Sequence, residues 1–285
     1  MSALLLVTMA TLLASGQSPA DAPAKNVLGQ SAAAADSARE ILDMALRDYE
    51  QAVAAEKQSA AEARTLYQKA LQGFDTLASR GHLNGHLYYN IANTYLRLGD
   101  RGRAILNYRR ASKLIPSDRD VRHNLAHARS LVSLQLESSP SSALMRNLLF
   151  WHFDTSLRFR TALAISLFVA FWIVLGVKLF IRRRLPALTS LAIIGGLAGL
   201  AAGASVTWDM TAARRPGEGV LVGDQVILRK GSGVAYEPQV DRPLPAGLEV
   251  KILETRAGAS GDLWRRVKLS ERIDGWVPAS QIETL

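Results

Sequence analysis

Two long apolar runs stand out in the hydrophobic pattern past the middle of the chain. Residues 161–181 carry a single charge, at Lys178, and residues 185–208 carry none. A helix of about 20 apolar residues is long enough to cross the hydrocarbon core of a bilayer. Only three arginines, residues 182–184, separate the two runs. The pattern therefore predicts a two-helix transmembrane hairpin over residues 161–208.

The arginines in the predicted turn indicate how the hairpin is oriented. Short loops rich in Lys and Arg stay on the cytoplasmic side of a membrane. Both flanking regions are then expected on the opposite side, in the periplasm of a bacterial inner membrane. Residues 1–16 hold an apolar stretch followed by small residues, which is typical of a signal peptide. Because no Lys or Arg precedes that stretch, an uncleaved anchor is the alternative.

Small and aromatic residues suggest how the hairpin packs. Gly195, Gly199 and Gly203 recur every four residues, so they share a helix face that permits close approach of another helix. We expect this face to pack against the first run, with homo-oligomerisation through the same glycines as the alternative. Residues 144–160 mix aromatic side chains with arginines and predict a segment lying along the membrane interface.

The hydrophobic period becomes helical between residues 85 and 118. Two amphipathic patterns meet at the sequence LGD, where Gly99 is expected to end the first helix, and Pro116 closes the unit. Small residues on both faces allow the two helices to approach closely, and aromatic residues fill the flanking volume. The face positions are Tyr88, Ile91, Ala92 and Tyr95 in the first helix, and Ala104, Tyr108 and Ala111 in the second.

This unit resembles a tetratricopeptide repeat in the order of its aromatic, small, LGD and Pro positions. A degenerate earlier unit is visible in residues 63–74, ARTLYQKALQGF, with its first helix expected at about 36–57, and the sequence after Pro116 suits a terminal capping helix. One helical hairpin cannot bury its own apolar face, so neighbouring helices are required. The resemblance implies an all-α protein-binding repeat domain over residues 23–136.

In this family the first helix of each unit lines a concave groove, and the resemblance places several polar side chains there. Paired amides can hold an extended peptide backbone or a terminal carboxylate, and an arginine adds charge complementarity. The alternative is that these are solvated polar positions. A metal site is not predicted, because HNLAH lacks the glutamate of HExxH. The candidate groove residues are Tyr89, Asn90, Asn93, Arg97, His123, Asn124 and His127.

Residues 217–285 change to short runs of period two, with glycines at the expected turns. Their motifs LRKGSG, LPAGLEVKIL, LWRRVKL and GWVPAS resemble bacterial SH3-like domains, which implies a small all-β barrel. In that family the two tryptophans build the core and an adjacent aromatic groove. Tyr236, Trp264 and Trp276 are therefore the candidate binding surface, and a purely core role is favoured for Trp264.

Composition removes several classes of function. The chain has no cysteine, which excludes disulfides and thiolate metal sites. Its net charge of +9 divides between the helical region and the membrane segment, without the basic and aromatic interleaving that nucleic-acid binding requires. We find no GxSxG, P-loop, Rossmann glycine pattern or paired carboxylates, and so expect neither an enzyme nor a cofactor.

The order of these segments makes a multidomain chain: a tetratricopeptide-repeat domain, a transmembrane hairpin with an FWHFD lead-in, and an SH3-like barrel. This order resembles the BatE-type family of the bacterial aerotolerance operon. The resemblance implies partners that are membrane proteins with von Willebrand A domains, a MoxR-type ATPase in the same system, and a role in stress tolerance. Two hypotheses result: a non-catalytic membrane-anchored scaffold, or a cell-wall sensor whose SH3-like domain binds peptidoglycan.

Overall fold

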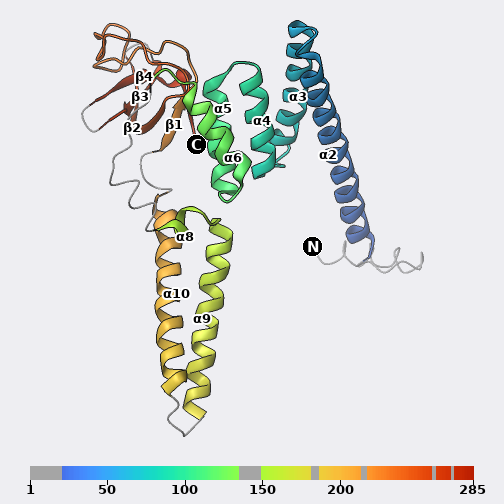
Figure 1. The fold of residues 1–285 in the computed structure, drawn as a ribbon, viewed down its shortest axis with the longest axis vertical. Helices are drawn as coiled ribbons and strands as arrows, with labels where there is room; N and C mark the ends of the chain where they lie inside the picture. The colour runs from blue at the N-terminus through green and yellow to red at the C-terminus, as the bar shows by residue number, and fades with distance from the viewer. Residues whose placement is uncertain (1–20, 135–148, 181–185, 213–216, 259–260, 271–272) are drawn as a thin grey trace, which may run out of the picture. The chain divides into compact units, whose positions relative to one another are not determined.

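The computed structural model describes residues 21–134, 149–180, 186–212, 217–258, 261–270 and 273–285 (Figure 1). The chain divides into two compact units, Met1–His82 and Leu83–Leu285. The expected signal peptide at residues 1–16 lies outside the described residues.

The first unit is an antiparallel pair of helices, α2 (Asp21–Ala55) and α3 (Ala60–Ser79). Ser59 begins α3 as its N-cap, because its hydroxyl accepts a hydrogen bond from the Glu62 backbone N–H. The first helix was expected at about 36–57, and the observed α2 begins 15 or so residues earlier in an alanine-rich sequence that favours helix. The face that α3 buries comprises Ala63, Tyr67, Ala70, Phe74 and Leu77.

The second unit begins with three short helices, α4 (Gly85–Arg97), α5 (Arg101–Leu114) and α6 (Arg119–Ser130), which we call the repeat helices. Each starts at a side-chain N-cap: Asn84, Asp100 and Asp118. The helical hairpin predicted for residues 85–118 is thus present as α4 and α5. It turns at Gly99, whose φ of 86° is a left-handed conformation that favours glycine.

Residues 217–285, which we call the β-domain, form an antiparallel sheet in the strand order β4-β3-β2-β1-β5. The β2–β3 register shifts between Ile252 and Glu254, which marks a β-bulge. Closure of this sheet into an SH3-like barrel stays a prediction. The strands are β1 (Glu218–Leu221), β2 (Glu249–Ala257), β3 (Leu263–Lys268), β4 (Asp274–Pro278) and β5 (Ile282–Thr284), with a short 3-10 turn, η1 (Ala279–Gln281), before β5.

Between these regions lie a short helix, α8 (Phe150–Phe153), and two long helices that pack side by side (Figure 1). The long helices, α9 (Leu157–Phe180) and α10 (Pro186–Ala212), are both long and apolar enough to cross a membrane. The structure therefore contains the two predicted apolar helices, each a few residues longer at the end away from the arginine turn.

The glycine face of α10 is only partly in the helix–helix contact. A Cβ atom on Gly199 would lie 3.5 Å from Leu167 of α9, whereas Gly195 and Gly203 have open space around them. Four-residue steps rotate about 40° around a helix, so Gly195 and Gly203 lie about 40° to either side of Gly199 and away from the line of contact. Ala192 and Ala202 are buried instead. The expectation that all three glycines pack against α9 is therefore corrected.

The segment predicted to lie along the membrane interface, residues 144–160, overlaps the start of a long helix and stays a prediction. Residues 157–160 belong to the long helix α9, because the helical period continues upstream of the uncharged run. Arg160 is 5% exposed and donates a hydrogen bond to Asp209 of α10, rather than extending toward headgroups. Residues 144–148 lie outside the part of the chain that the structure describes.

Candidate protein-interaction site

The amide and phenol side chains predicted for the groove lie together on α4 and α6. Asn124 Nδ2 on α6 donates to Tyr89 Oη at 3.0 Å and to Asn93 Oδ1 at 3.1 Å, both on α4. The buried hydroxyl of Tyr108 on α5 donates to the same Asn93 oxygen. The three helices thus share one hydrogen-bond network, which fixes the rotamers of the two amides.

This network leaves complementary polar groups available. Asn93 uses only its oxygen and Asn124 only its nitrogen within the described residues, so Asn93 retains two N–H donors and Asn124 an acceptor. A peptide backbone offers the matching acceptor and donor. The pair is therefore able to bind an extended segment through its main chain without specifying the side chains.

The remaining predicted groove residues differ in exposure. His123 and His127 on α6 and Arg97 at the end of α4 are exposed, and Asn90 is half-buried. α4 contains no acidic residue, and the candidate groove residues named here are arginine, histidine or asparagine. They therefore add positive charge or none to this surface. In the described ranges no three His, Asp or Glu side chains gather in a way that could hold a metal ion. The chemistry of the site is hydrogen bonding and attraction of negative charge.

The sequence did not reveal that the β-domain packs against the repeat helices. Val220 of β1 is fully buried in the same hydrophobic cluster as Ile105 of α5 and Val132 after α6. A Cβ atom on Gly102 of α5 would lie 2.7 Å from the Leu221 carbonyl oxygen, so the backbones of the two parts are nearly in contact. The sequence feature that pointed to this contact was Gly102, because a glycine inside a helix weakens the helix and so needs another reason to be there.

Ion pairs surround this apolar contact. Arg109 of α5 donates to Glu218 of β1 at 2.5 Å, and its Nε lies 3.3 Å from Glu249 of β2 without hydrogen-bond alignment. Glu249 also accepts from Arg129 of α6 at 2.6 Å. Arg103 of α5 donates to Glu283 of β5 at 3.2 Å. These pairs are partly exposed, so each contributes little alone, and their number and shared partners make the contact specific.

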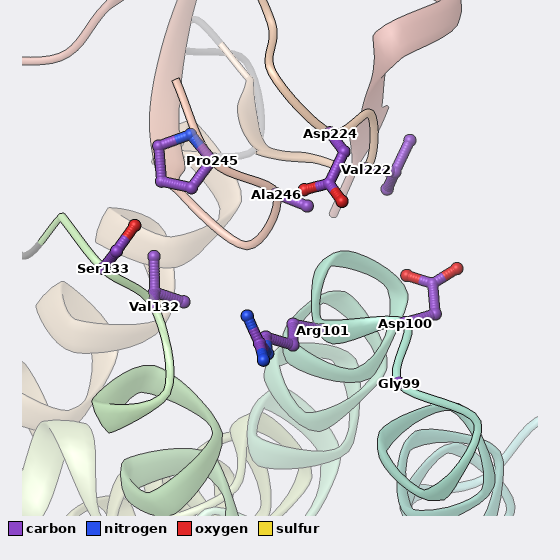
Figure 2. Close-up of a pocket in the computed structure, with 9 residues that line it drawn as sticks. All are labelled: Gly99, Asp100, Arg101, Val132, Ser133, Val222, Asp224, Pro245 and Ala246. Atoms are coloured by element: carbon purple, nitrogen blue, oxygen red, sulfur yellow. The ribbon is translucent and has the colours of Figure 1, made fainter. Parts of the chain in front are cut away.

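A cleft of about 230 Å³ opens where the two parts meet (Figure 2). Arg101 enters it from the start of α5, and Asp224 approaches from the β-domain side. Gly99, Asp100, Val132, Ser133, Val222, Pro245 and Ala246 complete the lining. Because Asp100 already caps α5 and pairs with Arg103, the other polar side chains of the lining are Arg101, Ser133 and Asp224.

The three aromatic residues predicted as a binding surface of the β-domain differ in exposure. Trp264 is 2% exposed and Trp276 is 7% exposed, whereas Tyr236 is 53% exposed. Arg256 lies over the Trp276 ring, with its guanidinium carbon 5.3 Å from the ring centre. Val267 and Val277 belong to the core of the sheet, so the register of β3 and β4 puts both tryptophans on the opposite face, where their neighbours cover them. The surface of Tyr236, Trp264 and Trp276 stays a prediction, in which Tyr236 is the exposed member.

Comparison with known proteins agrees with the geometry of the helical part. The tetratricopeptide repeat family matches residues 85–118, which cover α4, α5 and the loop after them. No curated protein matches the chain. The chain therefore contains a tetratricopeptide repeat, a type of module that suggests a scaffold for contacts with other proteins.

Proposed function

We propose that the protein is a non-catalytic, membrane-anchored scaffold that binds an extended segment of a partner protein on the α4 and α6 face. The observation that carries this proposal is the fixed pair of half-buried amides, Asn93 and Asn124, which keep donors and an acceptor that the network does not use. The β-domain packs on α5 and the end of α6, and the exposed His123 and His127 remain accessible. The candidate groove is therefore free to receive a ligand.

The anchoring part of the proposal rests on α9 and α10. The repeat helices precede these two helices in the chain, the β-domain follows them, and the two parts share a hydrophobic cluster. Two regions in contact occupy one compartment, so a hairpin that crosses the membrane enters and leaves on the same side. The arginine-rich turn places that side in the periplasm by the positive-inside rule.

The charge of the groove indicates the kind of segment that binds. Arg97, His123 and His127 add positive or neutral charge beside the amides, and α4 carries no acid. A partner segment with acidic side chains or a free carboxyl terminus matches this surface. Following the resemblance to BatE-type proteins, we propose membrane proteins with von Willebrand A domains as partners, in a system that includes a MoxR-type ATPase.

Affinity capture from detergent extracts tests the scaffold. The wild-type chain is compared with Asn124→Ala and His127→Ala, and with His82→Ala as a matched control, because His82 is an exposed histidine outside the repeat helices. We expect specific partners that the wild type and His82→Ala recover and that the two groove variants lose. Recovery of the same proteins by all four chains contradicts the groove.

Peptidoglycan sensing is the second candidate, favoured by the exposed ring of Tyr236 on the β-domain. An exposed aromatic ring can stack on the apolar face of a sugar or hold a peptide stem. Co-sedimentation of the full chain with purified sacculi, with Tyr236→Ala as the variant, distinguishes the two functions. Binding that Tyr236→Ala abolishes supports sensing, and the absence of binding leaves the scaffold as the function.

A further inference from the structure

A polar cluster lies where α9 begins and α10 ends. Its members are His152 of α8, Arg160 of α9, and Ser205 and Asp209 of α10. Arg160 is 5% exposed and Ser205 is 7% exposed. A buried charge beside apolar helices is stable only when it is paired. The pairing inside this cluster therefore decides how α8 is attached to the two long helices.

The hydrogen bonds of Arg160 define the protonation state of His152. Arg160 donates to Asp209 Oδ2 at 2.5 Å and, through Nη1, to Ser205 Oγ at 2.8 Å. The same Nη1 lies 2.7 Å from His152 Nδ1. A guanidinium carries donors only, so this contact is a hydrogen bond when Nδ1 is unprotonated, and Ser205 Oγ lies 2.7 Å from the same Nδ1. The arrangement favours a neutral His152 with its proton on Nε2, which faces Asp209 Oδ1 at 3.5 Å.

We propose that His152 is a proton-operated latch that holds α8 against the two long helices when neutral and releases it when protonated. A proton from solvent on Nδ1 removes the acceptor for Arg160 and places two donors 2.7 Å apart. Ser205 Oγ lies 2.7 Å from the same Nδ1 and can accept its proton, but the charged imidazole then still lies beside the guanidinium of Arg160, a contact between like charges. Separation of His152 from Arg160 is the way to remove it.

The surroundings of His152 favour the neutral form. Burial has the largest effect and lowers the pKa of His152 below its ordinary value, and the positive charge of Arg160 lowers it further. Asp209 acts in the opposite direction, but its other oxygen is already engaged by Arg160. Within the described residues these two are the charged groups that α9 and α10 direct at His152, and α8 itself adds none.

The direction of the pH effect follows from linkage. The released histidine has a pKa of about 6.5 and the latched histidine a lower one, so the latch has its full stability above about pH 6.5. Stability is lost as the pH falls below that value, by up to about tenfold in the opening equilibrium per pH unit. In the chain, α8 lies between the repeat helices and α9. Its release therefore changes how the repeat helices are connected to α9, with or without a ligand in the groove.

Hydrogen exchange of the full chain in lipid nanodiscs tests the latch. Exchange of backbone amides in residues 149–156 is compared at about pH 7.5 and about pH 5, after correction for intrinsic rates. In the wild type we expect protection to fall at the lower pH, by at most about tenfold for each pH unit below about 6.5. In His152→Gln the side-chain oxygen accepts from Arg160 and does not titrate, so protection stays constant. His82→Gln, an exposed histidine elsewhere, is the matched control and keeps the wild-type response.

A direct titration covers the case in which His152→Gln does not fold. The chain has five histidines, and their imidazole NMR signals can be followed with pH in the wild type. We expect the His152 signal to titrate below the ordinary value for histidine. Titration of the His152 signal at the ordinary value overturns the latch. Equal pH dependence of exchange in the wild type and His152→Gln overturns it as well.

Discussion

Gly102→Ala separates docking of the β-domain from folding of the repeat helices. The added Cβ atom would lie 2.7 Å from the Leu221 carbonyl oxygen and 2.8 Å from Val222 Cα, where ordinary contact begins at 3.4 Å. Both neighbours are backbone, so the β-domain must move away by several tenths of an ångström. Overpacking of this kind costs about 1–3 kcal/mol. Alanine also favours the helix by about 1 kcal/mol, but it does so in the docked and undocked states alike.

The docking equilibrium therefore bears the whole cost, which is about a 5- to 150-fold shift toward the undocked state. Arg103→Cys and Glu283→Cys provide the assay, because their parent side chains meet at 3.2 Å and the natural chain has no other thiol. We expect a short bis-maleimide to join the two cysteines efficiently with Gly102 and poorly with Gly102→Ala. Ser112→Ala on the same helix is the control. Equal cross-linking of all these chains would refute the close backbone contact.

Three further predictions concern the docking of the β-domain on the repeat helices and the packing inside the first unit. Raising salt to about 1 M shortens the screening length to about 3 Å, so docking measured by the same cross-link should weaken without being lost. A cross-linking yield that does not change with salt would argue against the ion pairs. Arg109→Glu should weaken docking by about 1 kcal/mol or more, and adding Glu249→Arg should restore part of the lost docking free energy. A double-mutant cycle measures this coupling between the two residues. Tyr67→Phe removes the 2.6 Å hydrogen bond to Glu56 and should lower the opening free energy of α3 by about 1 kcal/mol in hydrogen exchange, whereas an unchanged value would show the bond to be neutral.

The helical hairpin could be predicted because local patterns determine it. Ala92 and Ala104 are both fully buried, as expected for small residues that let two helices approach closely. Gly99 ends α4 in the left-handed conformation that few other residues adopt. These features depend on residues within about one turn of each other, and so they can be read directly from the sequence.

The contact between the repeat helices and the β-domain could not be predicted in this way. Arg109 and Glu249 are 140 positions apart, and each by itself looks like an ordinary solvated charge. Val220 reads as a strand residue that faces the core of its own sheet, but it enters the helical cluster instead. Pairings of this kind depend on how two folded surfaces meet. The hydrophobic period of a segment contains no information about such contacts.

The sequence was also unequally informative about the residues of the candidate sites. The groove amides were predicted from a repeat signature that assigns helix positions to the concave face, but the hydrogen bond from Tyr108 to Asn93 was not foreseen. Trp276 was predicted on a surface because an aromatic side chain suits either a core or a groove, and the sequence does not show how far its neighbours cover it. The partner of Arg160 was missed because Asp209 lies one residue beyond the predicted apolar run.

Cysteine accessibility in intact spheroplasts tests most directly the central claim, that the two recognition parts share one side of a membrane to which the hairpin anchors them. Single cysteines are introduced at Ser117 after α5, at Arg183 in the predicted turn and at Gln239 in the β-domain, where Ser117 and Gln239 are exposed. A membrane-impermeant maleimide is expected to label Ser117→Cys and Gln239→Cys from outside, and to label Arg183→Cys only after lysis. Labelling of Ser117→Cys and Gln239→Cys on opposite sides, or recovery of the chain in the soluble fraction, would contradict the account.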